Sequence, residues 1–203
     1  MDIAVTLYMA RNMTKLTKRA RQAISSKNKI YKCGVSLIRK YGFDAVTIEQ
    51  IAKKAGVSVG TYYYYFQSKM ELLKEIFNKA DRYFLEEVEG HLNVNTCKEQ
   101  IVEYFDRYAE YTLTDGIELI KKLYTSENKL FIVEGRGMQN ALTNILRAGQ
   151  EKNEIHSGRP PEEITKMLFV VARGVIFDWC LYDGEIDLKA EMKDIIEAMA
   201  RHL

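Results

Sequence analysis

Apolar residues recur at intervals of three and four along most of this chain, which is the spacing of one face of an α-helix. Alternating runs typical of strands are few, and the two prolines, Pro160 and Pro161, are adjacent. Thr47 and Thr96 each stand three residues before Gln or Glu, a pattern typical of helix starts. The pattern therefore predicts an all-α fold of about nine helices. We expect them at about 26–41, 48–55, 59–65, 69–89, 97–112, 115–126, 131–152, 161–182 and 188–202.

Charge is divided unevenly between the two ends of the chain. Residues 1–69 hold 13 Lys and Arg against 3 Asp and Glu, a balance of +10. Residues 70–203 hold 17 against 25, a balance of −8, and the two balances give the net charge of +2. A basic block of this kind predicts that the first part meets a polyanion and the second does not. A solvated run of charges without a partner is the alternative that composition leaves open.

Composition also excludes several kinds of protein. No apolar run reaches the roughly 18 to 20 residues of a membrane span, and residues 1–10 lack the features of a signal peptide. The three cysteines are widely spaced and there are only three histidines, so we expect no disulfide, no metal site and no cofactor. No phosphate-binding loop, nucleophile elbow or paired Glu-x-x-His motif occurs, so we expect no catalytic residues. We expect a bacterial-type cytoplasmic protein associated with the nucleoid.

Two short helices, expected at 48–55 and 59–65, are joined by Ala55-Gly56-Val57-Ser58. A three- to four-residue turn with a glycine between short helices is the helix-turn-helix pattern. Gly56 allows the positive φ that such a turn needs, and Ser58 stands where it can cap the second helix. This spacing favours DNA binding, and an ordinary corner between two helices is the alternative.

Five aromatic residues stand in a row from Tyr62 to Phe66. Because successive helical residues are about 100° apart, the five cannot share one face. Tyr62 and Phe66, four apart, are expected to pack inward, which leaves Tyr63 and Tyr64 on the opposite side. Exposed tyrosines can donate to phosphates or pack on thymine methyl groups, so the row strengthens the prediction of DNA binding.

The segment TIEQIAKKAGVSVGTYYYYF (residues 47–66), followed by Gln67-Ser68-Lys69, resembles the DNA-binding domain of TetR/AcrR-type transcriptional regulators. The likeness covers about residues 27–77 and is carried by the order and spacing of cap, turn, Tyr-Phe pair and Ser-Lys pair. It implies a three-helix domain whose third helix enters the major groove of DNA. It further implies base contacts by Val59, Gly60, Thr61 and Tyr63, and phosphate contacts by Thr47, Ser58, Tyr64, Tyr65 and Lys69.

Val59 departs from the polar or basic residue of many such regulators. An apolar side chain can contact a thymine methyl group but forms no hydrogen bond with a base, so DNA shape and a basic N-terminal arm are expected to share the recognition. A solvated tail or a misassigned start is the alternative for that arm. The organisation expected is an arm at 1–24, a DNA-binding domain at 25–75 (motif 47–66), and a ligand-binding and dimerisation domain at 76–203. The basic residues of the arm are Arg11, Lys15, Lys18, Arg19 and Arg21.

The segment 161–182 is apolar nearly all round, so it is expected to be buried on more than one side. Together with 188–202 it can form a four-helix bundle with a second copy. The resemblance agrees, since TetR-type regulators are typically homodimers through their last two helices. Burial within a single chain is the alternative. The residues expected at the dimer interface are Ile164, Leu168, Val171, Val175, Leu188, Met192, Ile195 and Met199.

The helices between about 97 and 152 carry a stripe of aromatic residues. In the family that the chain resembles, this region encloses a mostly apolar inducer pocket. A stripe that only fills the core is the alternative. The residues expected to line a pocket for a small lipophilic ligand are Tyr104, Tyr108, Tyr111, Tyr124, Phe131, Met138 and Trp179.

These features together predict a ligand-responsive DNA-binding transcriptional regulator, in the simplest case a repressor that a small molecule releases from its operator. A homodimer would place two DNA-binding domains in successive major grooves of a near-palindromic, double-stranded operator. An architectural or activator protein that binds DNA without a small-molecule inducer is the alternative. A fully packed C-terminal domain would favour that alternative.

Overall fold

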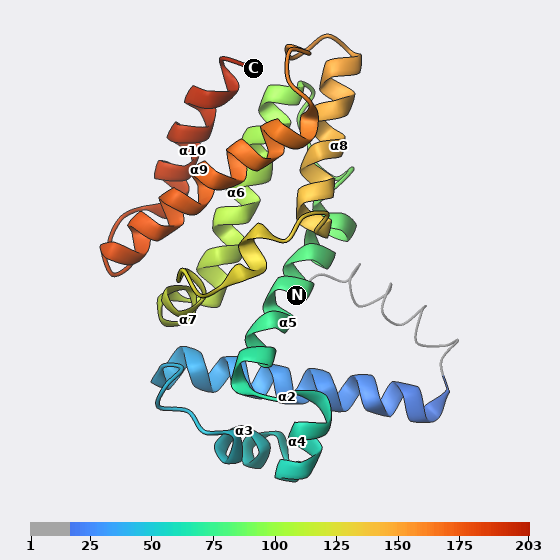
Figure 1. Ribbon diagram of the computed structural model, residues 1–203, viewed down its shortest axis with the longest axis vertical. Helices are drawn as coiled ribbons and strands as arrows, with labels where there is room; N and C mark the ends of the chain where they lie inside the picture. Colours follow the sequence, from blue (N-terminus) through green and yellow to red (C-terminus); the bar gives the residue numbers. More distant parts are fainter. Residues whose placement is uncertain (1–16) are drawn as a thin grey trace. The chain divides into compact units, whose positions relative to one another are not determined.

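The computed structural model describes residues 17–203, and that part of the chain is all-helical, with nine α-helices and no strand (Figure 1). The expected all-α fold is confirmed. The helices are α2 (Lys18–Tyr41), α3 (Ile48–Ala55), α4 (Val59–Tyr65), α5 (Lys69–Tyr83), α6 (Cys97–Asp115), α7 (Ile117–Leu123), α8 (Gly137–Glu151), α9 (Pro161–Leu181) and α10 (Leu188–Ala200), with a π-helical turn at Phe84–Val88 and a 3₁₀ turn at Lys129–Ile132.

Three helix boundaries differ by six residues or more from those expected. The first helix begins at Lys18, eight residues before the expected start, because Thr17 caps it by accepting a hydrogen bond from the amide of Ala20 (3.2 Å). The expected helix at 69–89 ends as a regular α-helix at Tyr83 and continues as the π-helical turn. The expected helix at 131–152 begins only at Gly137. Of the expected basic arm, residues 1–16 lie outside the described residues, so Arg11 and Lys15 have no structural account.

Contacts divide the chain into two units, Met1–Leu72 and Leu73–Leu203. In the described part of the first unit, α2 packs on α3 and α3 packs on α4. The core of this unit is made by side chains such as Ile30, Ile38 and Ile51, each without solvent exposure. Gly34 on α2 allows the close approach of Leu72, since a Cβ atom there would lie 2.5 Å from Leu72 Cδ1.

In the second unit, four long helices pack in a closed ring of contacts. Helix α6 packs against α8 and α10, and α9 packs against the same two helices (Figure 1). The interior is rich in aromatic rings, among them Phe84, Tyr104 and Phe105, which are fully buried. All nine buried residues of α9 lie on one side of the helix, so the expectation that 161–182 is buried on more than one side is not met within the protomer. The short helix α7 packs on α6 and α9 and completes the wall of the cavity described below.

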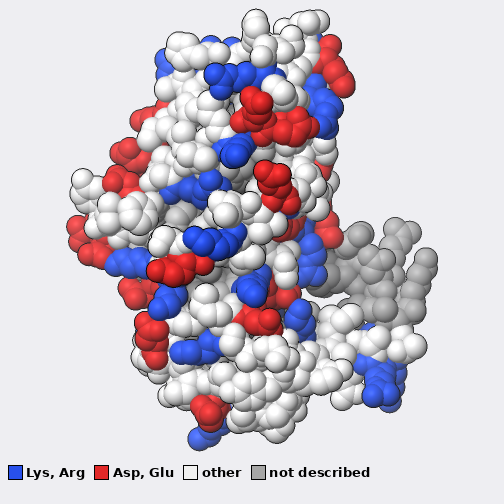
Figure 2. Space-filling model, viewed as in Figure 1, with Lys and Arg blue, Asp and Glu red and all other residues white. Residues whose placement is uncertain are grey.

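Charge follows the division into units. Between residues 17 and 69 the only acidic residues are Asp44 and Glu49. Over the C-terminal unit, by contrast, basic and acidic side chains are interspersed (Figure 2). Within residues 17–203, no helix is long and apolar enough to cross a membrane. The same residues contain no group of three or more His, Cys, Asp and Glu side chains that could hold a metal ion.

Candidate nucleic-acid interface and ligand cavity

The turn between α3 and α4 is fixed by caps at both helix starts. Thr47 Oγ1 accepts from the Gln50 amide (3.2 Å), and Gln50 Oε1 accepts from the Thr47 amide (2.9 Å), which closes a capping box. Gly56 ends α3 in the left-handed conformation, with φ at 63°. Ser58 Oγ then accepts from the Thr61 amide (3.0 Å) and begins α4. These local bonds set the angle between the two helices.

Helix α4 has one buried and one exposed aromatic face, as the 100° spacing predicted. Tyr62 and Phe66 are buried, and the Tyr62 hydroxyl donates to the carbonyl of Ser68 (3.2 Å). Burial raises the pKa of Tyr62 to about 12, so the phenol stays neutral at any physiological pH. On the other side, Tyr63 is 45% exposed and Tyr64 is 78% exposed. Two solvent-exposed tyrosine rings are energetically costly on a helix of only seven residues. Exposed aromatic side chains of this kind are typical of a contact surface.

Most of the other residues expected to contact DNA also lie at the surface of this unit. Thr47, Ser58, Val59 and Gly60 are exposed, and Thr61 and Tyr65 are half-buried. At Gly60 a Cβ atom would meet only Ser58 Oγ, at 3.7 Å, so the backbone here is open to close approach. The exposed face of α4 and the caps of α3 and α4 together form one continuous surface. This surface is a candidate site for binding a polyanion.

Lys69 has a different environment from the one expected. Its ammonium donates to the carbonyls of Phe43 (2.7 Å) and Val46 (2.6 Å), and it lies 4.5 Å from the centre of the Phe43 ring. The charge is therefore directed at the loop that leads into α3 rather than at solvent. The sequence could not indicate this, because the acceptors are backbone oxygens 23 and 26 residues away.

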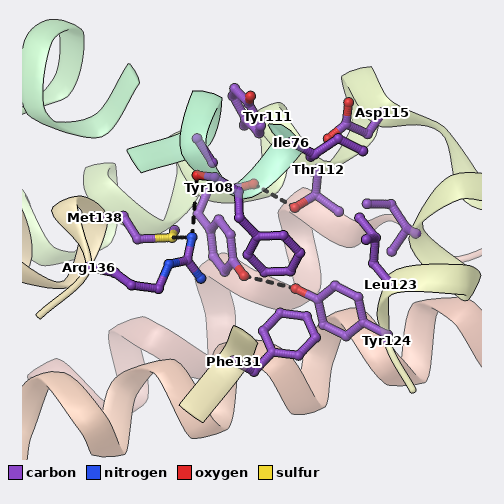
Figure 3. A pocket seen from close by; sticks show the side chains of 13 residues that line it. Ile76, Tyr108, Tyr111, Thr112, Asp115, Leu123, Tyr124, Phe131, Arg136 and Met138 are labelled. Carbon is purple, nitrogen blue, oxygen red and sulfur yellow. Dashed lines mark hydrogen bonds between the residues drawn. The ribbon is translucent and has the colours of Figure 1, made fainter. Parts of the chain in front are cut away.

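A cavity of about 40 Å³ lies inside the C-terminal unit, between α5, α6, α7 and the segment before α8 (Figure 3). Its wall is mostly aromatic, and the hydroxyls of Tyr108 and Tyr124 share a hydrogen bond across it (2.8 Å). Burial raises the pKa of both phenols, which remain neutral donors and acceptors. The lining residues are Ile76, Phe77, Ala80, Tyr108, Tyr111, Thr112, Asp115, Ile120, Leu123, Tyr124, Phe131, Arg136 and Met138.

Five of the seven residues expected to line a pocket line this cavity, namely Tyr108, Tyr111, Tyr124, Phe131 and Met138. The other two do not. Tyr104 is fully buried in the core behind the cavity, where its hydroxyl donates to the Met138 carbonyl (2.5 Å). Trp179 is 4% exposed and packs in the interior near Gly184.

Sequence reasoning missed two charged residues in the wall, Asp115 and Arg136. Arg136 Nε donates to Asp81 Oδ2 and Arg136 Nη2 donates to Asp81 Oδ1, each at 3.1 Å, in a two-pronged ion pair. The guanidinium also lies 4.6 Å from the centre of the Phe77 ring. A lone arginine in the glycine-flanked segment Gly135-Arg136-Gly137 was the available signal, but its partner lies 55 residues away.

A larger groove of about 490 Å³ lies next to the cavity, and Phe131 lines both. The Phe131 ring contacts the rings of Tyr124 and Phe77, with centroids 4.7 and 5.2 Å apart. Arg173 donates to the Phe131 carbonyl from the other side (3.2 Å). Phe131 thus lies between an aromatic cavity and an open groove, which is lined by the basic Lys166 and Arg173 and by the acidic Glu134, Glu162 and Glu163.

Comparison with known proteins agrees with this arrangement. The family described as "Bacterial regulatory proteins, tetR family" matches residues 30–76, which hold the helix-turn-helix. The chain is a TetR-family transcriptional regulator. The fatty acid metabolism regulator protein of Bacillus subtilis is 25% identical over 177 residues, which cover 84% of this chain and 91% of that protein. Members of the family are transcriptional regulators rather than enzymes, and they bind DNA operators.

Solved structures share the fold along most of the chain. Thermus thermophilus FadR in complex with lauroyl-CoA superposes with a TM-score of 0.71 at 21% identity, covering 87% of this chain and 94% of that one. Bacillus subtilis FadR in complex with stearoyl-CoA superposes with a TM-score of 0.68 at 22% identity, covering 86% and 98%. At these identities the structures establish the fold of this TetR-family regulator and nothing about its ligand.

In the regulator's last two helices, the residues expected at a dimer interface are mostly turned inward. Ile164, Leu168, Val175, Leu188 and Met192 are at most 6% exposed, so they hold the protomer together and have no surface to offer a second copy. Val171 and Met199 are half-buried, and Ile195 is 37% exposed. The exposed apolar side chains are instead Val170, Phe177, Leu181 and Tyr182, between 50% and 64% exposed, and Gly174 lies among them with open space around it.

Proposed function

We propose that this regulator is a repressor whose binding to a near-palindromic operator is controlled by a lipophilic ligand, with long-chain acyl thioesters as the first class to test. The DNA-binding domain is 25–75 with its motif at 47–66, the arm is 1–24, and 76–203 bind ligand and dimerise. Its site of action is the bacterial nucleoid in the cytoplasm. The observation that carries the DNA-binding part is the capped turn that presents the exposed tyrosines of α4.

On the DNA side, we infer that α4 lies in the major groove. Val59, Gly60, Thr61 and Tyr63 approach base edges, and the apolar Val59 contacts a thymine methyl group. The hydroxyls of Thr47, Ser58, Tyr64 and Tyr65 lie on the flanks of the same surface and donate to phosphates. Lys69 acts on this surface indirectly, since its ammonium holds the loop before Thr47.

The proposed dimer uses the exposed apolar face of α9. Val170, Gly174, Phe177 and Leu181 follow one another at intervals of four, three and four, so they form one stripe along the helix. The small Gly174 lets a second helix approach closely, and Ile195 on α10 supplies another exposed apolar side chain. Two copies would bring two recognition helices to half-sites about 34 to 36 Å apart.

On the ligand side, the proposal rests on the aromatic cavity and the groove beside it. A cavity of about 40 Å³ is far below the roughly 300 to 1,000 Å³ of sites for drug-sized ligands. A ligand must therefore displace wall residues, and Phe131 is the one whose movement joins the cavity to the groove of about 490 Å³. An acyl chain suits the aromatic interior, and the groove offers Lys166 and Arg173 to the phosphates of coenzyme A, beside the acidic Glu134, Glu162 and Glu163. Lauroyl-CoA and stearoyl-CoA are the ligands in the two FadR complexes.

The test is a fluorescence-anisotropy titration of the full chain with duplex DNA from upstream of its own gene, over a range of salt concentrations. We expect tight, salt-dependent and sequence-selective binding that dodecanoyl-CoA weakens. Tyr64→Phe removes one exposed hydroxyl and is expected to weaken operator binding about 2- to 10-fold, the worth of one hydrogen bond. Tyr83→Phe, an equally mild change at a half-buried position in the other unit, is the matched control. Absence of any selective DNA binding by the wild-type chain would overturn the proposal.

One observation favours a second candidate, a DNA-binding protein with no inducer. The C-terminal unit is closely packed around its small cavity. In that case the cavity is a packing defect of a few water volumes. Operator binding that is selective but unaffected by acyl thioesters and other lipophilic compounds would support this candidate over the first.

A further inference from the structure

The cavity wall carries one basic side chain, Arg136, and the structure holds its guanidinium firmly. The side chains of Arg136 and Asp81 are 10% and 20% exposed, so both charges are largely removed from water. Asp81 Oδ1 also accepts from the Met138 amide (3.1 Å), which fixes the carboxylate in turn. Met138 Sδ and the Phe77 carbonyl complete the surroundings of Nη2, at 3.4 and 3.5 Å.

These bonds use Nε and Nη2 and leave Nη1. Within the described residues 17–203, Nη1 has no hydrogen-bond acceptor, although the residue lines the cavity. Figure 3 shows the guanidinium of Arg136 reaching in beside the ring of Tyr108, whose hydroxyl meets that of Tyr124. The cavity thus offers a fixed pair of N–H donors and two phenols in an aromatic surrounding. This set recognises a hydrogen-bond acceptor attached to an apolar body.

The charge of the Arg136–Asp81 pair limits which acceptor is suitable. The pair is neutral as a whole, and Asp115 places an acidic side chain in the cavity wall. A ligand carboxylate placed on Nη1 would bring another negative charge close to Asp81 in a site with little water. Like charges at such a site disfavour the ionised form by a pKa unit or more. A carbonyl oxygen accepts the same hydrogen bond without adding charge.

We propose that Arg136 and Asp81 together select ligands whose polar end in the cavity is a neutral carbonyl, as in a thioester, ester or amide, over the carboxylate of the same chain length. This inference rests on the proposed function, because it names the chemistry that the same cavity accepts. Arg136 is the donor, and Asp81 is a positioning residue that also excludes anions.

The experiment compares decanamide with decanoate by isothermal titration calorimetry at pH 7.5 on the full chain. We expect the wild-type protein to bind the amide at least about tenfold more tightly. Asp81→Asn keeps the size of the side chain and its acceptor for the Met138 amide but leaves Arg136 uncompensated. In this variant the preference is expected to shift by about tenfold or more toward decanoate. Asp106→Asn, which loses an ion pair with Lys189 on the outside of α6, is the control and is expected to keep the wild-type ratio.

A second measurement needs no variant, in case Asp81→Asn does not fold. If the site rejects carboxylates, the pKa of decanoate is higher when it is bound than when it is free, so its affinity is expected to rise as the pH is lowered from 7.5 to about 5.5, which titrations at the two pH values measure. The affinity of decanamide is expected to stay the same. Equal affinities for the two ligands in the wild type, a decanoate affinity that does not rise at the lower pH, or an unchanged ratio in Asp81→Asn would overturn the inference. Such results together with binding of dodecanoyl-CoA would leave the proposed function intact, whereas no binding of any acyl compound would overturn both.

Discussion

Replacing Lys69 by methionine distinguishes a phosphate contact from a structural one. The methionine keeps an apolar stem of similar length and loses the ammonium, and with it two short bonds to the carbonyls of Phe43 and Val46. A hydrogen bond from a charged donor contributes about 1.5 to 3 kcal/mol, and the ring contact with Phe43 adds about 0.5 to 1 kcal/mol. Because Lys69 is only half-buried, solvent screening reduces the contribution of these contacts. We therefore expect Lys69→Met to lower the free energy of unfolding by about 2 to 3 kcal/mol.

For a chain of this size, each kcal/mol lowers the midpoint of thermal unfolding by about 2 to 4 °C, so the Lys69→Met variant is expected to melt about 5 to 10 °C lower. Circular dichroism measures the melting, and operator titrations at several salt concentrations measure the number of phosphate contacts. Each contact contributes about 0.9 to the slope of log affinity against log salt. We expect the slope to stay at the wild-type value after correction for the folded fraction.

Lys53→Met is the matched control, because Lys53 is an exposed lysine of α3. It loses the same charge and is expected to leave the melting temperature within about 1 °C of wild type. A Lys69→Met variant that melts like the wild type, with a slope lowered by about 0.9 for each Lys69 in the complex, would refute the structural role and restore the phosphate contact.

Three further predictions concern the C-terminal unit and the thiols. Phe177→Asp places a charge on the exposed stripe of α9 and is expected to convert the proposed dimer to a monomer without loss of helicity, as measured by analytical ultracentrifugation and circular dichroism. Phe131→Ala joins the cavity to the groove and is expected to raise the association rate of dodecanoyl-CoA about tenfold in stopped-flow measurements, whereas Leu130→Ala, a neighbour outside both the cavity and the groove, is not. Burial raises the pKa of the Cys97 and Cys180 thiols to about 11. Since only the thiolate reacts, both are expected to resist iodoacetamide at pH 8 and to react as the pH approaches 11, while the half-exposed Cys33 is alkylated first, as mass spectrometry of the native protein would show.

The structural features that could be predicted from the sequence are those that depend on residues close together in the chain. The turn at Gly56 and the inward position of Tyr62 and Phe66 follow from caps and from the 100° step, which act within a few residues. The early start of α2 shows the limit of this reasoning. The start was expected near residue 26, whereas Thr17 supplies the actual cap.

For a helix that is apolar nearly all round, the sequence could not predict which face is buried within the protomer. In α9 the positions expected to meet a second copy, such as Leu168 and Val175, are buried in the protomer, and Val170 and Phe177 are exposed instead. Periodicity gives the spacing of a stripe and not the partner that covers it. The roles of Lys69 and Arg136 could not be predicted from the sequence either. Their partners are more than 20 residues away, and the packing of other helices brings them into contact.

Helix α5 is the element through which ligand and operator can be linked. Its first residue, Lys69, belongs to the N-terminal unit and holds the loop before α3. Twelve residues later, Asp81 belongs to the C-terminal unit and holds both Arg136 and the first turn of α8. Because a helix transmits displacement along its axis with little loss, a ligand that engages Arg136 acts on a helix that is anchored in each unit. A coupling free energy of about 1 to 3 kcal/mol changes operator affinity about 5- to 150-fold. Such a coupling arises when the ligand binds more tightly with Asp81 in one position than in another.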